Sequence, residues 1–176
     1  TCLRYLWAQY TLEENDMPTT AKPFSALTDQ IQRQLDSIVE MAVQVDRSGV
    51  THVPLRSHWT VAGLLNHQRY VIRFWIANVV VGADLPVPWT DDSPHKDWNA
   101  DPEVALETFV NALQQEWKDA LSLLAAYPPG ELASQADDDG NRPTVDWVLS
   151  HLLAEVARHA GHMDAVCEIL KLSPAE

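Results

Sequence analysis

The sequence predicts an all-α protein, a four-helix bundle with long connections. Four segments repeat apolar residues at spacings of three and four, which is the periodicity of amphipathic helices. No segment combines strand alternation with hairpin signals. Three connections, residues 47–59, 83–100 and 131–143, are longer than the roughly two to eight residues usual in a simple bundle. Connections of that length indicate a crossover between helices or a functional loop.

The first two helices are expected over about residues 25–46 and 60–81. Ser25 is the expected N-cap of the first, and Gly82 follows the last periodic residue of the second. Their apolar sets recur at helical spacing: Leu27, Ile31, Leu35, Ile38, Ala42 and Val45 in the first, and Val61, Leu64, Leu65, Ile72, Trp75, Ile76 and Val79 in the second.

The third helix is expected to begin at Asp101 and the fourth to span about residues 144–172. Asp101 is a good N-cap, Pro102 suits the first helical position, and Glu103 complements the positive end of the helix dipole. The third helix ends before Pro128, Pro129 and Gly130.

Residues 25–172 are expected to form one domain, with residues 1–24 as an N-terminal extension. The only cysteines are Cys2 and Cys167, which form no disulfide framework and suit a reducing cytoplasm. No apolar run approaches the roughly 20 residues that span a bilayer.

The chain is strongly acidic, with 25 acidic residues against 12 basic ones and a formal charge of −13. Nucleic-acid binding is not expected, because it needs a basic surface. The same charge disfavours anionic membranes as partners. The sequence leaves the oligomeric state open, and a homodimer is one option.

The most informative stretch is His151 to His162 in the fourth helix. With Glu155 at zero, His151 falls at about −40°, His162 at about −20° and His159 at about +40° around the helix. Apolar residues share this arc, which predicts that it faces inward. A carboxylate among three histidines is costly to bury unless something pairs with it, and a metal ion would do so. Glu155 and His159, four residues apart, are spaced to share one ion.

His67 of the second helix is the best candidate for a third ligand. It lies among apolar residues at the edge of the core stripe. Two histidines and one carboxylate leave coordination positions open, as in catalytic zinc sites, and nickel or iron are alternatives. A metal-free hydrogen-bonded pair of Glu155 and His159 is the competing interpretation.

The other histidines, His52, His58 and His95, are read as structural or surface residues. His95 lies in the connection 83–100, which also holds Trp89, Trp98, Asp84, Asp91, Asp92 and Asp97. This connection is interpreted as a solvated acidic loop in preference to a lid over the site.

Two blocks resemble the DinB/YfiT-like superfamily of metal-binding bundles. The first runs from Trp59 to His67, with Trp-Thr-Val-Ala-Gly-Leu-Leu-Asn-His, and the second covers residues 145–164 with its Glu-x-x-x-His. The likeness is closest to the metal-binding domain of mycothiol-dependent maleylpyruvate isomerase. It implies a four-helix bundle with a long crossover and places the family's metal ligands on His67, Glu155 and His159.

The resemblance implies a metal-dependent enzyme that activates a mycothiol-like low-molecular-weight thiol for transfer to a small electrophile. His162 would move a proton in catalysis or act as a hydrogen-bond partner. The alternatives are a metal-dependent hydrolase and a non-enzymatic metal- or partner-binding bundle. Two departures limit the likeness: Tyr70 and Ile72 stand where related chains carry acids, and the isomerase's second domain is missing, so maleylpyruvate isomerisation is not expected.

Overall fold

The computed structural model describes residues 24–48, 53, 59–136 and 140–172. The helices in chain order are α1 (Ser25–Arg47), α2 (Val61–Ile72), the π-helix η2 (Arg73–Val81), the 3₁₀ turn η3 (Lys96–Trp98), α3 (Leu106–Leu124) and α4 (Val145–Leu170). Within these residues, β pairing is limited to two isolated bridges. The predicted all-α bundle is therefore confirmed. The expected N-terminal extension lies outside the described residues, except for Phe24.

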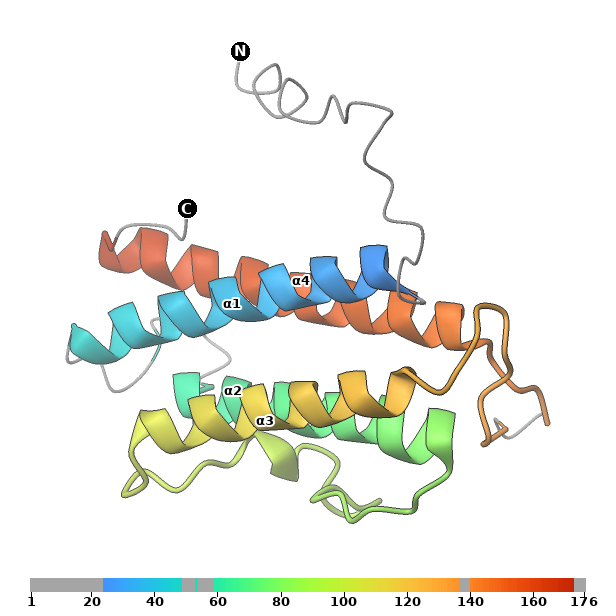
Figure 1. Ribbon diagram of the computed structural model, residues 1–176. Coiled ribbons are helices and arrows are strands. Elements are labelled where there is room, and N and C mark those ends of the chain that lie inside the picture. The colour runs from blue at the N-terminus through green and yellow to red at the C-terminus, as the bar shows by residue number, and fades with distance from the viewer. Residues whose placement is uncertain (1–23, 49–52, 54–58, 137–139, 173–176) are drawn as a thin grey trace, which may run out of the picture.

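The four helices form two layers of two (Figure 1). α1 and α4 lie side by side and run in the same direction, while α2 with η2 and α3 form the second layer and run the opposite way. Because α2 and α3 are parallel, residues 82–105 must return along the full length of the bundle. The structure thus confirms the predicted long crossover connection.

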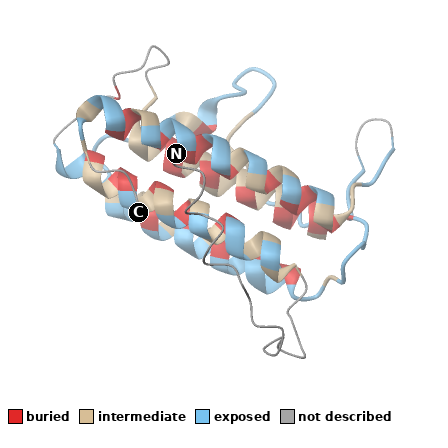
Figure 2. Cartoon of the chain, turned by 90° about the horizontal axis from the view of Figure 1, so that it is seen from above, coloured by how far each residue is buried: buried red, intermediate tan, exposed pale blue. Residues whose placement is uncertain are grey.

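The core lies between the two layers, toward which each helix turns its apolar face. Figure 2 shows buried residues recurring along the helices between exposed ones. Burial of these side chains is the main force that holds the layers together. All four helices contribute large side chains that are less than 2% exposed: Ile31, Ile38 and Met41 in α1, Leu64, Leu65, Ile72 and Ile76 in α2 and η2, Leu113 in α3, and Leu149, Leu152 and Met163 in α4. No helix in the described part of the chain is both long and apolar enough to span a membrane.

The second predicted helix has the expected extent but two different geometries. Thr60 caps it, since its Oγ1 accepts a hydrogen bond from the backbone N–H of Gly63 at 3.0 Å. From Arg73 onward the helix is a π-helix and not the predicted α-helix, and it ends at Gly82 in the left-handed conformation. Apolar spacing over nine residues does not distinguish the two helix types.

The predicted start of the third helix is wrong by four residues. Asp101 was expected to cap it, but α3 begins at Leu106 with Ala105 as N-cap. The Oδ1 atom of Asp101 accepts from the backbone N–H of Glu103 at 2.9 Å, and the N–H of Val104 bonds to the carbonyl of Asp101. The aspartate therefore closes a local turn, an arrangement that competes with helix capping.

Candidate metal centre

The structure brings His67, Glu155 and His159 together. One potential ligand atom of each lies within 4.8 Å of those of the other two. The antiparallel packing of α2 on α4 places the rings of His67 and His159 4.9 Å apart between centroids. The spacing of four along α4 places Glu155 Oε2 3.7 Å from His159 Nε2.

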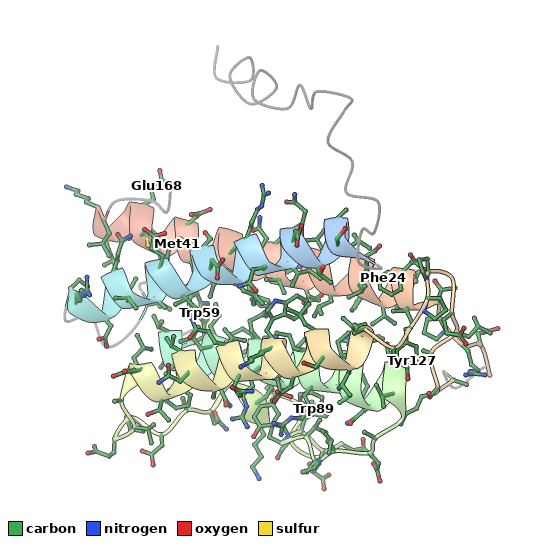
Figure 3. All side chains as sticks on the ribbon, viewed as in Figure 1. Phe24, Met41, Trp59, Trp89, Tyr127 and Glu168 are labelled. Carbon is green, nitrogen blue, oxygen red and sulfur yellow. The ribbon has the colours of Figure 1, made fainter. Side chains whose placement is uncertain are left out.

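Side chains fill the space between the helices (Figure 3). The site lies at the edge of this core, because its three residues are only partly exposed. The side chain of His159 is 7% exposed, that of His67 16% and that of Glu155 23%. The prediction that the whole arc of α4 faces inward is wrong for His162, which is exposed. The arc lies along the contact between α4 and α2, so the side of the arc that faces away from α2 reaches solvent.

Asp97 was expected in a solvated loop, but it lies beside His67. It is buried, and its Oδ2 lies 2.5 Å from Nδ1 of His67. The carboxylate accepts the Nδ1–H of the imidazole, which leaves the lone pair on Nε2 free for a metal. A carboxylate behind a histidine ligand is a recurrent feature of metal sites and fixes the ring's tautomer and orientation. The other three aspartates of this connection, Asp84, Asp91 and Asp92, are exposed as expected.

Trp98, the residue after Asp97, covers the two histidines. Its indole stacks on His67 with ring centroids 4.2 Å apart and an interplanar angle of 20°, and it lies 5.4 Å from the ring of His159. The side chain of Asn66 donates to the carbonyl of Asp97 at 2.7 Å. Together these contacts attach η3 to α2 directly above the site.

Gly63 is the residue that lets η3 approach α2 so closely. A Cβ atom at this position would overlap the backbone carbonyl oxygen of Trp98. A real Cβ cannot tolerate such a contact with backbone, so only glycine allows this packing. The short distance between Asp97 and His67 thus depends on a residue one turn before the histidine.

The electrostatics of His159 keep it neutral. Burial, followed by the neighbouring His67 and His162, lowers the pKa of His159 to about 3. Its Nδ1 lies 3.3 Å from Nδ1 of His162. When His159 donates its Nδ1–H to His162, its Nε2 lone pair points toward Glu155 and is available to a metal ion.

The donor set of two imidazoles and one carboxylate suits zinc, and it also suits nickel or ferrous iron. Three protein ligands leave at least one coordination position open. His95 is exposed in the crossover, whereas His52 and His58 lie outside the described residues.

Comparison with known protein families agrees with this geometry. A family model described as mycothiol-S-transferase matches residues 26–171, and this match confirms the resemblance to the DinB/YfiT-like superfamily. No curated protein matches the chain. Because the family model covers most of the sequence, the chain belongs to the mycothiol-S-transferase family.

Proposed function

We propose that the protein is a metal-dependent S-transferase that joins a low-molecular-weight thiol of the mycothiol type to a small electrophile. The convergence of His67, Glu155 and His159 is the observation that carries the proposal. The family match supports the class of thiol. The reducing cytoplasm suits this chemistry, because free thiols stay reduced there.

His67, Glu155 and His159 would hold the metal, with zinc as the first choice. A bound divalent cation supplies the positive charge that lowers the pKa of a thiol from its usual value of about 8.5 toward neutrality. The protein prepares this chemistry in two ways. Asp97 holds His67 in the ligating tautomer, and the depressed pKa of His159 keeps protons from competing for its nitrogen.

Among the described residues no cysteine is suited to be the reactive thiol, so we assign this thiol to the substrate. Cys167 is the only cysteine among the described residues, and it is buried in the core. Burial, with a smaller effect of Asp164, raises the pKa of its thiol. A buried, protonated thiol is a poor nucleophile, so Cys167 is unsuited to attack an electrophile.

His162 is proposed to move the proton that the substrate thiol loses. It is exposed to solvent and lies one turn beyond His159 on α4. In a substitution reaction the sulfur forms its bond to carbon while the leaving group departs with the bonding electron pair. The proton released by the thiol passes to the leaving group or to solvent, which restores neutral His162.

The first experiment measures metal and thiol binding together. We expect about one divalent ion per chain, and a sulfur-to-metal charge-transfer absorption when mycothiol is added to cobalt-substituted protein. His67→Ala and Glu155→Ala should lose tight metal binding, because each removes one of three ligands. His95→Ala is the matched control and should bind metal like the wild type, since His95 is exposed in the crossover.

The second experiment follows thiol consumption with a reactive electrophile. Consumption should accelerate with the metal-loaded protein and not with Glu155→Ala. A cobalt spectrum that thiol leaves unchanged, together with thiol-independent cleavage of esters or amides, would establish a hydrolase instead. Full metal occupancy without turnover of any substrate class would leave a metal-binding bundle with no enzymatic role.

A further inference from the structure

We propose that an aromatic pocket between η2 and the start of α4 binds an aromatic ring of the electrophile. The inference rests on the proposed S-transferase function and names the substrate class. The pocket has a volume of about 650 Å³, within the range of roughly 300–1,000 Å³ typical of small-molecule sites. Its walls include Phe74, Trp75, Val79, Pro143, Thr144 and Trp147.

The π-helix builds one wall of this pocket. Three wall residues lie in the π-helix η2, namely Phe74, Trp75 and Val79. Residues five apart, such as Phe74 and Val79, point about 140° apart around an α-helix. A π-helix bonds residues five apart and brings them to the same face. The unpredicted helix type thus gives the pocket its apolar wall, and π-helical turns are frequent at functional sites.

Indole rings form the side of the pocket nearest the seam between η2 and α4. The rings of Trp75 and Trp147 lie 5.9 Å apart, and the ring of His151 packs against both, 4.6 Å from Trp75 and 5.2 Å from Trp147. Trp147 nevertheless remains 51% exposed. An indole held in place by neighbours but still open to solvent offers a surface on which a planar aromatic group can stack.

The pocket and the metal centre lie at different levels along the same pair of helices. His67 of α2 packs against His159 of α4. Trp75, eight residues after His67, packs against His151, eight residues before His159. Eight helical residues correspond to about 12 Å, and Glu155 lies one turn from His151, or about 6 Å. An electrophile whose reactive carbon lies several bonds beyond its aromatic ring can therefore span the distance from Trp75 to the level of Glu155. This geometry favours electrophiles that carry an aromatic group.

The binding test uses 1,3-dinitrobenzene, an aromatic ring without a leaving group, titrated calorimetrically into the protein with and without zinc. Trp147→Ala should weaken binding at least about tenfold in both forms, and Trp147→Phe should restore most of the affinity. The matched control is Ile169→Ala, because Ile169 is also on α4 and equally exposed at 51%. Equal binding by Trp147→Ala and the wild type would overturn the proposal.

A kinetic test separates the pocket from the proposed function. With thiol in excess, Trp147→Ala should raise the KM for N-benzyl-2-iodoacetamide, from which the thiol displaces iodide, but not the KM for iodoacetamide, which has the same reactive carbon and no ring. If the wild type consumes no thiol but the tryptophan-dependent binding holds, the proposed function fails and the pocket stands. If thiol consumption holds while Trp147→Ala changes neither binding nor KM, the pocket proposal fails alone.

Discussion

The Nδ1 atom of His67 and the Oδ2 atom of Asp97 lie 2.5 Å apart, although thirty residues separate them in the chain. The contact joins the middle of α2 to the crossover that leads to α3. The turn of α2 that follows His67 carries no carboxylate, since Tyr70 and Ile72 stand there. Asp97 supplies a carboxylate to His67 from the crossover instead.

Replacement of Asp97 by asparagine should weaken metal binding about tenfold to a hundredfold. The amide does not carry the charge that makes His67 a stronger ligand and fixes its tautomer. Competition with a chromophoric chelator measures the affinity. Asp92→Asn, in an exposed part of the same connection, is the control and should bind metal like the wild type. Unchanged affinity in Asp97→Asn would mean that the short contact has no role in the site.

Gly63→Ala should reduce metal affinity although Gly63 offers no ligand. The added Cβ would meet the carbonyl oxygen of Trp98 and displace η3, and with it Asp97, from His67. Gly161→Ala in α4 is the matched control, because a Cβ there has no neighbour within 4 Å. That substitution should stabilise the fold by about 0.5–1 kcal/mol, since alanine is the better helix residue. Chemical unfolding and metal titration of both variants give the two comparisons.

The sequence predicted the part of the site that depends on helix periodicity. Glu155 and His159 share one face because they are four residues apart on one helix, and His67 lies on the stripe of α2 that packs toward them. The structure brings all three residues together as expected. Their role as metal ligands stays a prediction that the titrations above test.

Asp97 and the π-helix were outside the reach of the sequence argument. Asp97 is one of four aspartates in a connection without periodicity, and only tertiary packing distinguishes it from Asp84, Asp91 and Asp92. The adjacent Trp98 was the available signal, since a tryptophan in an acidic loop usually needs an apolar surface to cover. The start of α3 was misplaced for a related reason, because Asp101 is equally suited to capping a helix and to closing a turn.

The stability of the chelated, metal-free protein should fall with pH below about 6.5 in a way that depends on His159. The unfolded chain protonates this histidine near its ordinary pKa of 6.5, whereas the folded protein resists protonation down to about pH 3. The unfolded state therefore binds more protons between these values, and the free energy of unfolding decreases as the pH falls.

Urea unfolding of the wild type and His159→Gln across pH 7 to 4 measures this effect. The variant should have a shallower pH dependence, by up to about 1.4 kcal/mol per pH unit. His95→Gln is the control for an exposed histidine and should follow the wild type. Identical slopes for the wild type and His159→Gln would contradict the depressed pKa.

The last prediction separates two roles of His162. Its Nδ1 lone pair can accept the N–H of His159 or take a proton from the substrate thiol, but not both at once. If His162 carries the proton, His162→Gln should keep metal affinity within about twofold, because the amide oxygen still accepts from His159. It should lose about a hundredfold in kcat, within the range typical of general acid–base catalysis.

Added imidazole should restore part of that activity, because position 162 is exposed and a small base can reach it from solvent. His162→Phe serves as the comparison, since it removes both the proton carrier and the hydrogen-bond acceptor. It should lose metal affinity as well as turnover, and imidazole should not restore the affinity. If His162→Gln retains full kcat while His162→Phe loses metal, His162 acts only by holding the tautomer of His159. The proton must then leave the thiol directly to solvent.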